Sequence, residues 1–271
     1  MSPMRRIQAF EIHDLDRCPA FVRQTVVESL GLALRITGVC RVAAGAFRRF
    51  VQRTGARRVL DLCSGSGEPI ALLLDALHGV GAVPPQFVLS DLHPHLAQLD
   101  AVAARHAPLV EVVRRPVDAT RVPPDVDADA RTIFNALHHF PPRVVRALLA
   151  DSAARGQPLF VFEAAVRRPL RSIGMLGAVL AGAAVNPVVT RRHRLLKAVA
   201  TWGVPLLPGV LLWDSCVSYL RQYRLDELRA LASGLDPGWS LRHEVLRSGP
   251  LLAATVVTWE PAAAGAAPPG A

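Results

Sequence analysis

The feature that most constrains the fold of this chain is an alternation of short apolar runs with longer amphipathic segments between residues 57 and 166. Five runs have the length and apolar content of strands: 57–62, 85–91, 109–113, 131–137 and 158–166. Helices are expected between them over 69–78, 94–106 and 142–155. Strands separated by helices of this length form right-handed βαβ units, so the sheet should be mostly parallel.

The C-terminal segment 239–259 has a different pattern. Two apolar runs are joined by Ser248-Gly249-Pro250, which leaves no room for a crossover helix, so these strands must pair antiparallel. The predicted fold is α/β, with a seven-stranded, mostly parallel sheet that ends in an antiparallel hairpin and carries helices on both faces.

The turn after the first strand, in "VLDLCSGSGEPI" (59–70), is a candidate ligand site. Ligands of open α/β sheets bind at the carboxyl ends of the strands, and Gly65 and Gly67 let the backbone bend tightly there. A dinucleotide fingerprint would need a third glycine where Ile70 stands. Asp61 would also repel a pyrophosphate and attract a cation. A nicotinamide-dependent oxidoreductase is therefore the weaker alternative.

The run "VLDLCSGSG" resembles motif I of the class I S-adenosylmethionine-dependent methyltransferases, written hydrophobic-hydrophobic-D-x-G-x-G-x-G. Asp61, Gly65 and Gly67 match this motif, whereas Cys63 stands in place of its first glycine. The resemblance implies a Rossmann-like fold with S-adenosyl-L-methionine as cofactor, its methionyl end held by these four residues.

Three further segments resemble later motifs of this family in the same order. By this resemblance Asp91 would hold the ribose hydroxyls with Leu92 beside it, and Asp118-Ala119 would contact the adenine. "IFNALHHF" (133–140) resembles motif IV and places Asn135 at the methionyl part. Taken singly, Asp91 could instead cap a helix, and Asp118 could cap a helix or form a turn.

Methyl transfer from a sulfonium is an in-line displacement, and it needs a base only when the acceptor holds its proton at neutral pH. His138 is the candidate base, and His139 is expected to contact the acceptor. Alternatively, one histidine caps the following helix and the other lies half-buried beside Phe140. Glu163, in an apolar strand, either faces the cleft or pairs with an arginine.

The acceptor is expected to be a small molecule. The run at the fourth strand contains neither the (N/D)PP(Y/F) motif of amino-methylation of bases nor the Pro-Cys nucleophile of pyrimidine C5 methylation. The net charge of +9 comes almost wholly from scattered arginines, since Lys197 is the only lysine, and no nucleic-acid partner is expected.

The predicted organisation is an N-terminal helical cap (1–54), a methyltransferase domain (55–260) with a helical insertion at about 167–232, and a disordered tail (261–271). The cap should contain two helices broken around Gly31 or Gly38. The four cysteines show neither metal-type spacing nor a disulfide framework, and the N-terminus lacks an apolar signal region. We therefore expect a cytoplasmic protein with no bound metal.

Within the insertion, 172–213 is strongly apolar and flanked by arginines. It could form a hydrophobic lid, lie in a membrane interface or span a membrane, and Asn186-Pro187, Pro205 and Pro208 should interrupt its helices. A lid predicts an apolar or amphiphilic acceptor. The alternative function is a membrane-surface protein that binds S-adenosylmethionine without turnover.

The run "WDSCVSYLRQYRLDELRAL" (213–231), with "QAFEIHDLDRCPAF" (8–21), resembles a group of uncharacterised bacterial class I methyltransferases. Trp213 and Tyr223 are the predicted acceptor contacts from this run, with Asp214, Ser218 and Arg221 as further candidates. Alternatively, Trp213 and Leu220 belong to the core, and Asp214 and Arg221 form a structural ion pair.

Overall fold

The computed structural model describes residues 5–167 and 169–262, so most of the predicted disordered tail lies outside the described residues. The chain divides into two compact units. A helical unit comprises Met1–Cys40, Ala164–Tyr223 and Arg247–Ala254, and a sheet unit comprises Arg41–Glu163, Arg224–Leu246 and Thr255–Ala271. The helical unit thus combines the first part of the expected cap with most of the expected insertion. Most of the second N-terminal helix and the end of the expected insertion, from Arg224 on, belong to the sheet unit.

The sheet contains seven strands among the described residues: β1 Arg58–Leu62, β2 Gln86–Leu89, β3 Val110–Val112, β4 Ala130–Phe134, β5 Leu159–Glu163, β6 Trp239–Arg247 and β7 Ala253–Pro261. They follow the order β3-β2-β1-β4-β5-β7-β6. The first five strands pair in parallel, and β7 pairs antiparallel with β5. The predicted fold class is confirmed. Successive strands are added outward in opposite directions from the boundary between β1 and β4, and this boundary is the switch point where open sheets bind ligands.

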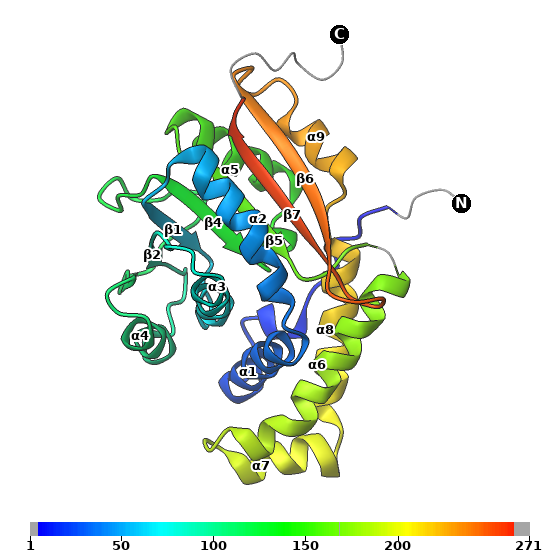
Figure 1. The fold of residues 1–271 in the computed structure, drawn as a ribbon. Helices are drawn as coiled ribbons and strands as arrows, with labels where there is room; N and C mark the ends of the chain where they lie inside the picture. Colours follow the sequence, from blue (N-terminus) through cyan, green and yellow to red (C-terminus); the bar gives the residue numbers. More distant parts are fainter. Residues whose placement is uncertain (1–4, 168, 263–271) are drawn as a thin grey trace. The chain divides into compact units, whose positions relative to one another are not determined.

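Five α-helices accompany the sheet in the described residues: α2 Val39–Thr54, α3 Glu68–Gly79, α4 Leu96–Arg105, α5 Pro142–Ala154 and α9 Leu225–Ala232. Figure 1 shows α2 in front of the strands and α5 behind them. Phe160 of β5 packs against Phe47 and Phe50 of α2, with ring centroids 5.2 and 5.5 Å away. On the opposite face Trp259 Nε1 donates to the carbonyl of Leu149 in α5 over 2.9 Å. Apolar side chains therefore cover both faces of the sheet.

The helical unit is built from α1 Ala20–Thr37, α6 Pro169–Val189, α7 Arg194–Ala198 and α8 Leu206–Arg221, with a 3-10 turn η1 at Ile12–Asp14 and a π-helical turn η3 at Val199–Gly203. Its core is shared by α1, α6 and α8, which meet through Val26, Val179 and Leu211. Gly182 of α6 lies so close to α1 that a Cβ there would stand 2.5 Å from the carbonyl oxygen of Ser29. Close approach of the two helices depends on this glycine.

One of the two expected glycines ends a helix, whereas two of the prolines do not interrupt a helix as we expected. The break between α1 and α2 falls at Gly38, whose φ of 59° caps α1, and not at Gly31. The prediction that Asn186-Pro187 interrupts a helix is wrong, because α6 continues to Val189. Pro187 cannot donate a hydrogen bond to the carbonyl of Ala183, and packing of α6 against α1 and α8 offsets this cost. Pro205 does precede the start of α8, but Pro208 lies in its first turn, where the missing N–H has no helical partner.

Among the residues that the structure describes, no single helix has both the length and the apolar composition to cross a membrane. Two sharply bent helix pairs, Ala20–Thr37 with Val39–Thr54 and Arg194–Gly203 with Leu206–Arg221, meet those criteria together.

Candidate functional site

The glycine-bearing turn connects β1 to α3 and has three residues with positive φ. Cys63 has φ 58°, Gly65 has φ 54° and Gly67 has φ 72°. A Cβ on Gly67 would lie 3.2 Å from Leu89 and Leu99, whereas a Cβ on Gly65 would meet nothing within 4 Å. Gly67 is therefore required by packing and by backbone conformation, and Gly65 leaves open space beside the turn. Cys63 holds a conformation that glycine adopts at much lower cost.

Asp61 is buried at the carboxyl end of β1, and both of its carboxylate oxygens are bound by other residues of the chain. Its carboxylate oxygens accept hydrogen bonds from Ser64 Oγ over 2.6 Å and from Thr132 Oγ1 over 2.7 Å. Burial raises the pKa of Asp61 to about 7, against the lowering effect of these two hydroxyls. Asp61 thus links the turn to β4.

Asp91 follows β2, and its carboxylate joins two loops. Oδ2 accepts from the backbone N–H of Gly65 over 2.8 Å, and Oδ1 accepts from that of His93 over 2.8 Å. Asp91 does not cap α4, whose N-cap residue is His95. Each carboxylate oxygen can accept more than one hydrogen bond, so the group retains capacity for a ligand.

The segment after β3 lies directly beside Asp91, because the N–H of Val117 donates to the Asp91 carbonyl over 2.8 Å. Asp118 forms a turn in which its Oδ1 accepts from both N–H and Oγ1 of Thr120, and these bonds lower the pKa of Asp118. The turn alternative for Asp118 is therefore realised. Ala119 is buried, and the Leu92 side chain is about half exposed.

Negative charge gathers around the turn. Burial and the neighbouring carboxylates of Asp91, Asp61 and Asp118 raise the pKa of the Cys63 thiol far above its ordinary value. The thiol therefore stays protonated, and the carboxylates around it come from the ends of three adjacent strands. Such a cradle disfavours a pyrophosphate and favours a ligand with positive charge.

A buried histidine–carboxylate pair lies beyond β4. Asn135, with φ 52°, leads into a short turn η2 (Leu137–His139), and Glu163 ends the neighbouring strand β5. His138 Nδ1 lies 2.8 Å from Glu163 Oε2, and its backbone N–H donates to Glu163 Oε1 over 3.2 Å. The partner we expected for Glu163, if it was paired, was an arginine, and the bonded partner found here is His138. Neither histidine caps α5, whose N-cap is Pro141.

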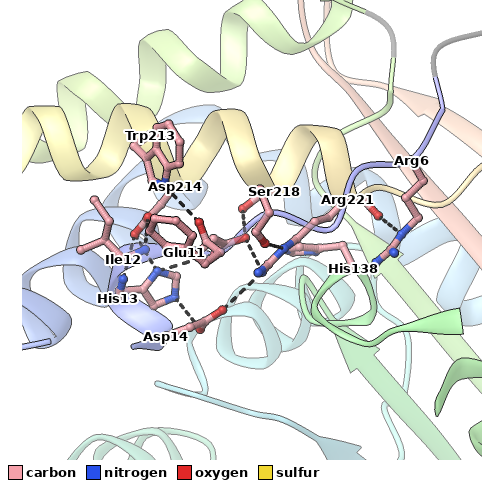
Figure 2. Close-up of polar contacts among 12 residues, drawn as sticks. Arg6, Glu11, Ile12, His13, Asp14, His138, Trp213, Asp214, Ser218 and Arg221 are labelled. Carbon is pink, nitrogen blue, oxygen red and sulfur yellow. Dashed lines mark hydrogen bonds and ion pairs between the residues drawn. The ribbon is translucent and has the colours of Figure 1, made fainter. Parts of the chain in front are cut away.

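In the helical unit, α8 and the N-terminal segment are joined by polar contacts (Figure 2). Asp214 accepts from the N–H of Ile12 over 2.6 Å and pairs with His13 Nδ1 at 2.8 Å. Arg221 Nη1 contacts Glu11 at 3.1 Å and Asp14 at 3.3 Å. The expected ion pair of Asp214 with Arg221 is wrong, because Asp214 binds Ile12 and His13 whereas Arg221 binds Glu11 and Asp14. The acidic cluster of Glu11, His13 and Asp14, whose ligand atoms lie close together, already has Arg221 as its cation.

The two aromatic side chains predicted to contact the acceptor also bind this segment. Trp213 is 44 % exposed, so it is not a core residue. Its Nε1 donates to the carbonyl of Phe10 over 3.0 Å, and its ring lies 5.6 Å from the Phe10 ring. The Arg6 guanidinium stands 4.1 Å over the Tyr223 ring. These contacts account for both residues structurally, and their contact with an acceptor stays a prediction.

No protein-family profile matches the chain, and a search of curated proteins finds no match. Among solved structures, the chain is similar to the plantazolicin methyltransferase BpumL. With a monoazolic desmethylPZN analog and SAH bound, that structure gives a TM-score of 0.51 at 11% identity, over 89% of this chain and 98% of that chain. The BpumL complex with SAH gives a TM-score of 0.50 at 11% identity, over 90% of this chain and 100% of that chain. Human N-acetylserotonin methyltransferase in complex with SAM gives a TM-score of 0.46 at 14% identity, over 87% of this chain and 56% of that chain.

The chain has the fold of the class I S-adenosylmethionine-dependent methyltransferases. This is the fold that its motif I turn and its terminal hairpin imply. Asp61 lies at the carboxyl end of β1, and Gly65, Gly67, Asp91 and Asp118 lie in the loops that follow β1, β2 and β3; their contact with a cofactor stays a prediction. Sequence reasoning missed the hydroxyl groups of Ser64 and Thr132 that bind Asp61, because their proximity depends on the register of β1 and β4.

Proposed function

We propose that this protein transfers a methyl group from S-adenosylmethionine to a small apolar or amphiphilic acceptor. The observation that carries the proposal is the acidic cradle around the glycine turn, formed by Asp61, Asp91 and Asp118. S-adenosylmethionine carries a cationic sulfonium and an ammonium, which such a cradle attracts. The BpumL structures of the same fold, with SAH bound, support the same cofactor.

The residues fit this cofactor on two grounds. Gly65 leaves open space beside the turn where a side chain would stand, and the Asp91 carboxylate can accept two hydrogen bonds from a vicinal diol beyond those it makes. In this assignment Gly65 and Gly67, with Cys63 and Asn135, border the methionyl part. Asp91 with Leu92 holds the ribose, and Asp118-Ala119 contacts the adenine. Asp61 acts through the turn that it fixes by its hydrogen bonds with Ser64 and Thr132.

When bound, S-adenosylmethionine supplies an electrophilic methyl group on sulfur. The chain's part is to hold the acceptor in line with that group and to remove a proton from it if necessary. Glu163 accepts a hydrogen bond from His138 Nδ1–H in the neutral tautomer, which makes Nε2 the basic atom. A base fixed in this way suits an acceptor hydroxyl, so we propose O-methylation with His138 as the catalytic base. His139, Trp213 and Tyr223 are the proposed acceptor contacts.

The cofactor is tested by calorimetric titration of S-adenosylhomocysteine and of NADH into the purified protein. We expect micromolar binding of the first ligand and no binding of the second, because the cradle repels the pyrophosphate. Binding of NADH with no binding of S-adenosylhomocysteine would overturn the proposal.

The base is tested with labelled S-adenosylmethionine and a panel of apolar phenols and hydroxy acids. His138→Ala should lower kcat by about 10²–10⁴-fold, the range measured for general bases. Glu163→Gln should shift the pH–rate profile, because it changes the partner that fixes the imidazole tautomer. His78→Ala, at an exposed position at the end of α3, is the control. An unchanged kcat in His138→Ala would exclude the assigned role.

A further inference from the structure

The helical unit exposes a cluster of apolar side chains where α6 gives way to α8. We name as the apolar tip the exposed residues Val185, Val188, Val189, Leu195, Leu196, Val199, Trp202, Val204 and Leu206. α6 and α8 lie side by side, and α7 lies at the end where the chain turns from one to the other (Figure 1). Leu195 is 83% exposed and Trp202 is 59% exposed. Isolated exposed apolar residues are common in proteins, but a group of them on helical elements that contact one another indicates an interaction surface.

The fold keeps these side chains outside. Beneath the tip, Lys197 is buried and its Nζ contacts Glu28 Oε2 of α1 at 2.5 Å and Thr190 Oγ1 at 2.6 Å. Thr190 Oγ1 in turn donates to Asn186 Oδ1 over 2.7 Å, and Asn186 Nδ2 donates to Ser29 Oγ over 3.1 Å. The inward-facing positions of α7 are thus occupied by an ion pair and its hydrogen bonds. Leu195 and Leu196, which precede Lys197 in α7, therefore stay exposed.

The charged side chains of the segment that forms the tip all have one sign. The sequence contains no aspartate or glutamate from residue 164 to residue 213. Arg191, Arg192 and Arg194 are exposed within the tip itself. An apolar group with a tryptophan, bordered by arginines, has the composition of a segment that lies at the boundary between headgroups and acyl chains.

We propose that the apolar tip docks on an anionic lipid bilayer, with its apolar side chains in the interfacial layer and its arginines on lipid phosphates. A second copy of the chain is a poorer occupant, since it would bring three arginines against three arginines. The proposal does not depend on methyl transfer.

The test is flotation of the purified full-length protein with vesicles. One set is phosphatidylcholine, and the other is an equimolar mixture of phosphatidylcholine and phosphatidylglycerol. We expect binding to the mixed vesicles that falls as salt is raised. Replacing Arg191 and Arg192 by alanine should weaken binding about fivefold for each arginine. Leu195→Glu should weaken it by about tenfold or more, because it places a charge in the apolar layer.

The matched control is Val83→Glu, which introduces the same charge at a position that is 93% exposed in a loop of the sheet unit. It should bind vesicles as the unaltered protein does. Absence of binding to mixed vesicles would overturn the proposal, as would equal losses in Leu195→Glu and Val83→Glu. Self-association that Leu195→Glu abolishes, without vesicle binding, would assign the tip to a second copy instead. S-adenosylhomocysteine binding, measured on the same variants, should not change, which separates this proposal from the proposed function.

Discussion

At the scale of single residues, Cys63 is the clearest departure from the motif that its segment resembles. It holds φ 58° at a position where the motif has glycine. A left-handed conformation costs an L-residue about 1–2 kcal/mol, and glycine avoids this cost. Part of the resulting stabilisation is lost because glycine has more conformational freedom in the unfolded chain. We expect Cys63→Gly to raise the free energy of unfolding by up to about 1 kcal/mol in urea denaturation.

The control for this prediction is Cys40→Gly, at a buried position within helix α2. There glycine should destabilise the protein by about 1 kcal/mol or more, since a helical glycine is unfavourable and the thiol packing is lost. Equal destabilisation by the two substitutions would show that the backbone at residue 63 is not strained.

Asp61 makes the stability depend on pH. Its pKa in the folded chain is raised from 3.8 to about 7, so between these values the folded state keeps a proton that the unfolded state releases. The stabilisation is complete below the unfolded value and is lost as pH rises toward 7. We expect the free energy of unfolding of the unaltered protein, relative to Asp61→Asn, to fall across that window. Parallel pH curves for the two proteins would contradict the assignment.

The residue types of the candidate site could be predicted from the sequence, but their partners could not. Asp61, Asp91 and Asp118 each follow an apolar strand, and strand ends meet at one edge of a parallel sheet. The partners of Glu163 and Asp214 are His138 and the 12–13 backbone, which lie 25 and about 200 residues away. Such pairs depend on tertiary packing, which no local pattern records.

At the scale of elements, the strands and helices of residues 57–166 were predictable because period and length both pointed to the same structure. The insertion was not, since Asn186-Pro187 favours a helix end that the structure does not have. Packing of α6 against α1 and α8 outweighs the local cost of a proline in the last turn.

Two glycines of α6 test how that packing is built. A Cβ at Gly182 would lie 2.5 Å from the Ser29 carbonyl, whereas a Cβ at Gly177 would meet nothing within 4 Å. We expect Gly182→Ala to lower the free energy of unfolding by about 1–3 kcal/mol through overpacking. Gly177→Ala should raise it by about 0.5–1 kcal/mol through helix propensity. The same effect from both substitutions would mean that α1 and α6 do not approach as described.

At the scale of the whole molecule, the chain builds its two units from interleaved segments. Along the sequence, the segments of the helical unit alternate with those of the sheet unit. Within the helical unit, residues 9–14 and α8 are joined through Asp214 and Arg221. The helical segments could be predicted from the sequence, but the elements against which they pack could not, because apolar helices of similar composition can pack on one another or on the sheet.

The most direct test of the central claim is a calorimetric titration of S-adenosylhomocysteine into the protein and into Asp91→Ala, with Asp100→Ala as a matched exposed control on α4. A charge-assisted contact to the ribose contributes about 1.5–3 kcal/mol, so Asp91→Ala should bind about ten- to a hundredfold more weakly. Asp100→Ala should bind as the unaltered protein does. Equal affinities in all three proteins, or no binding to any of them, would contradict the proposed cofactor site.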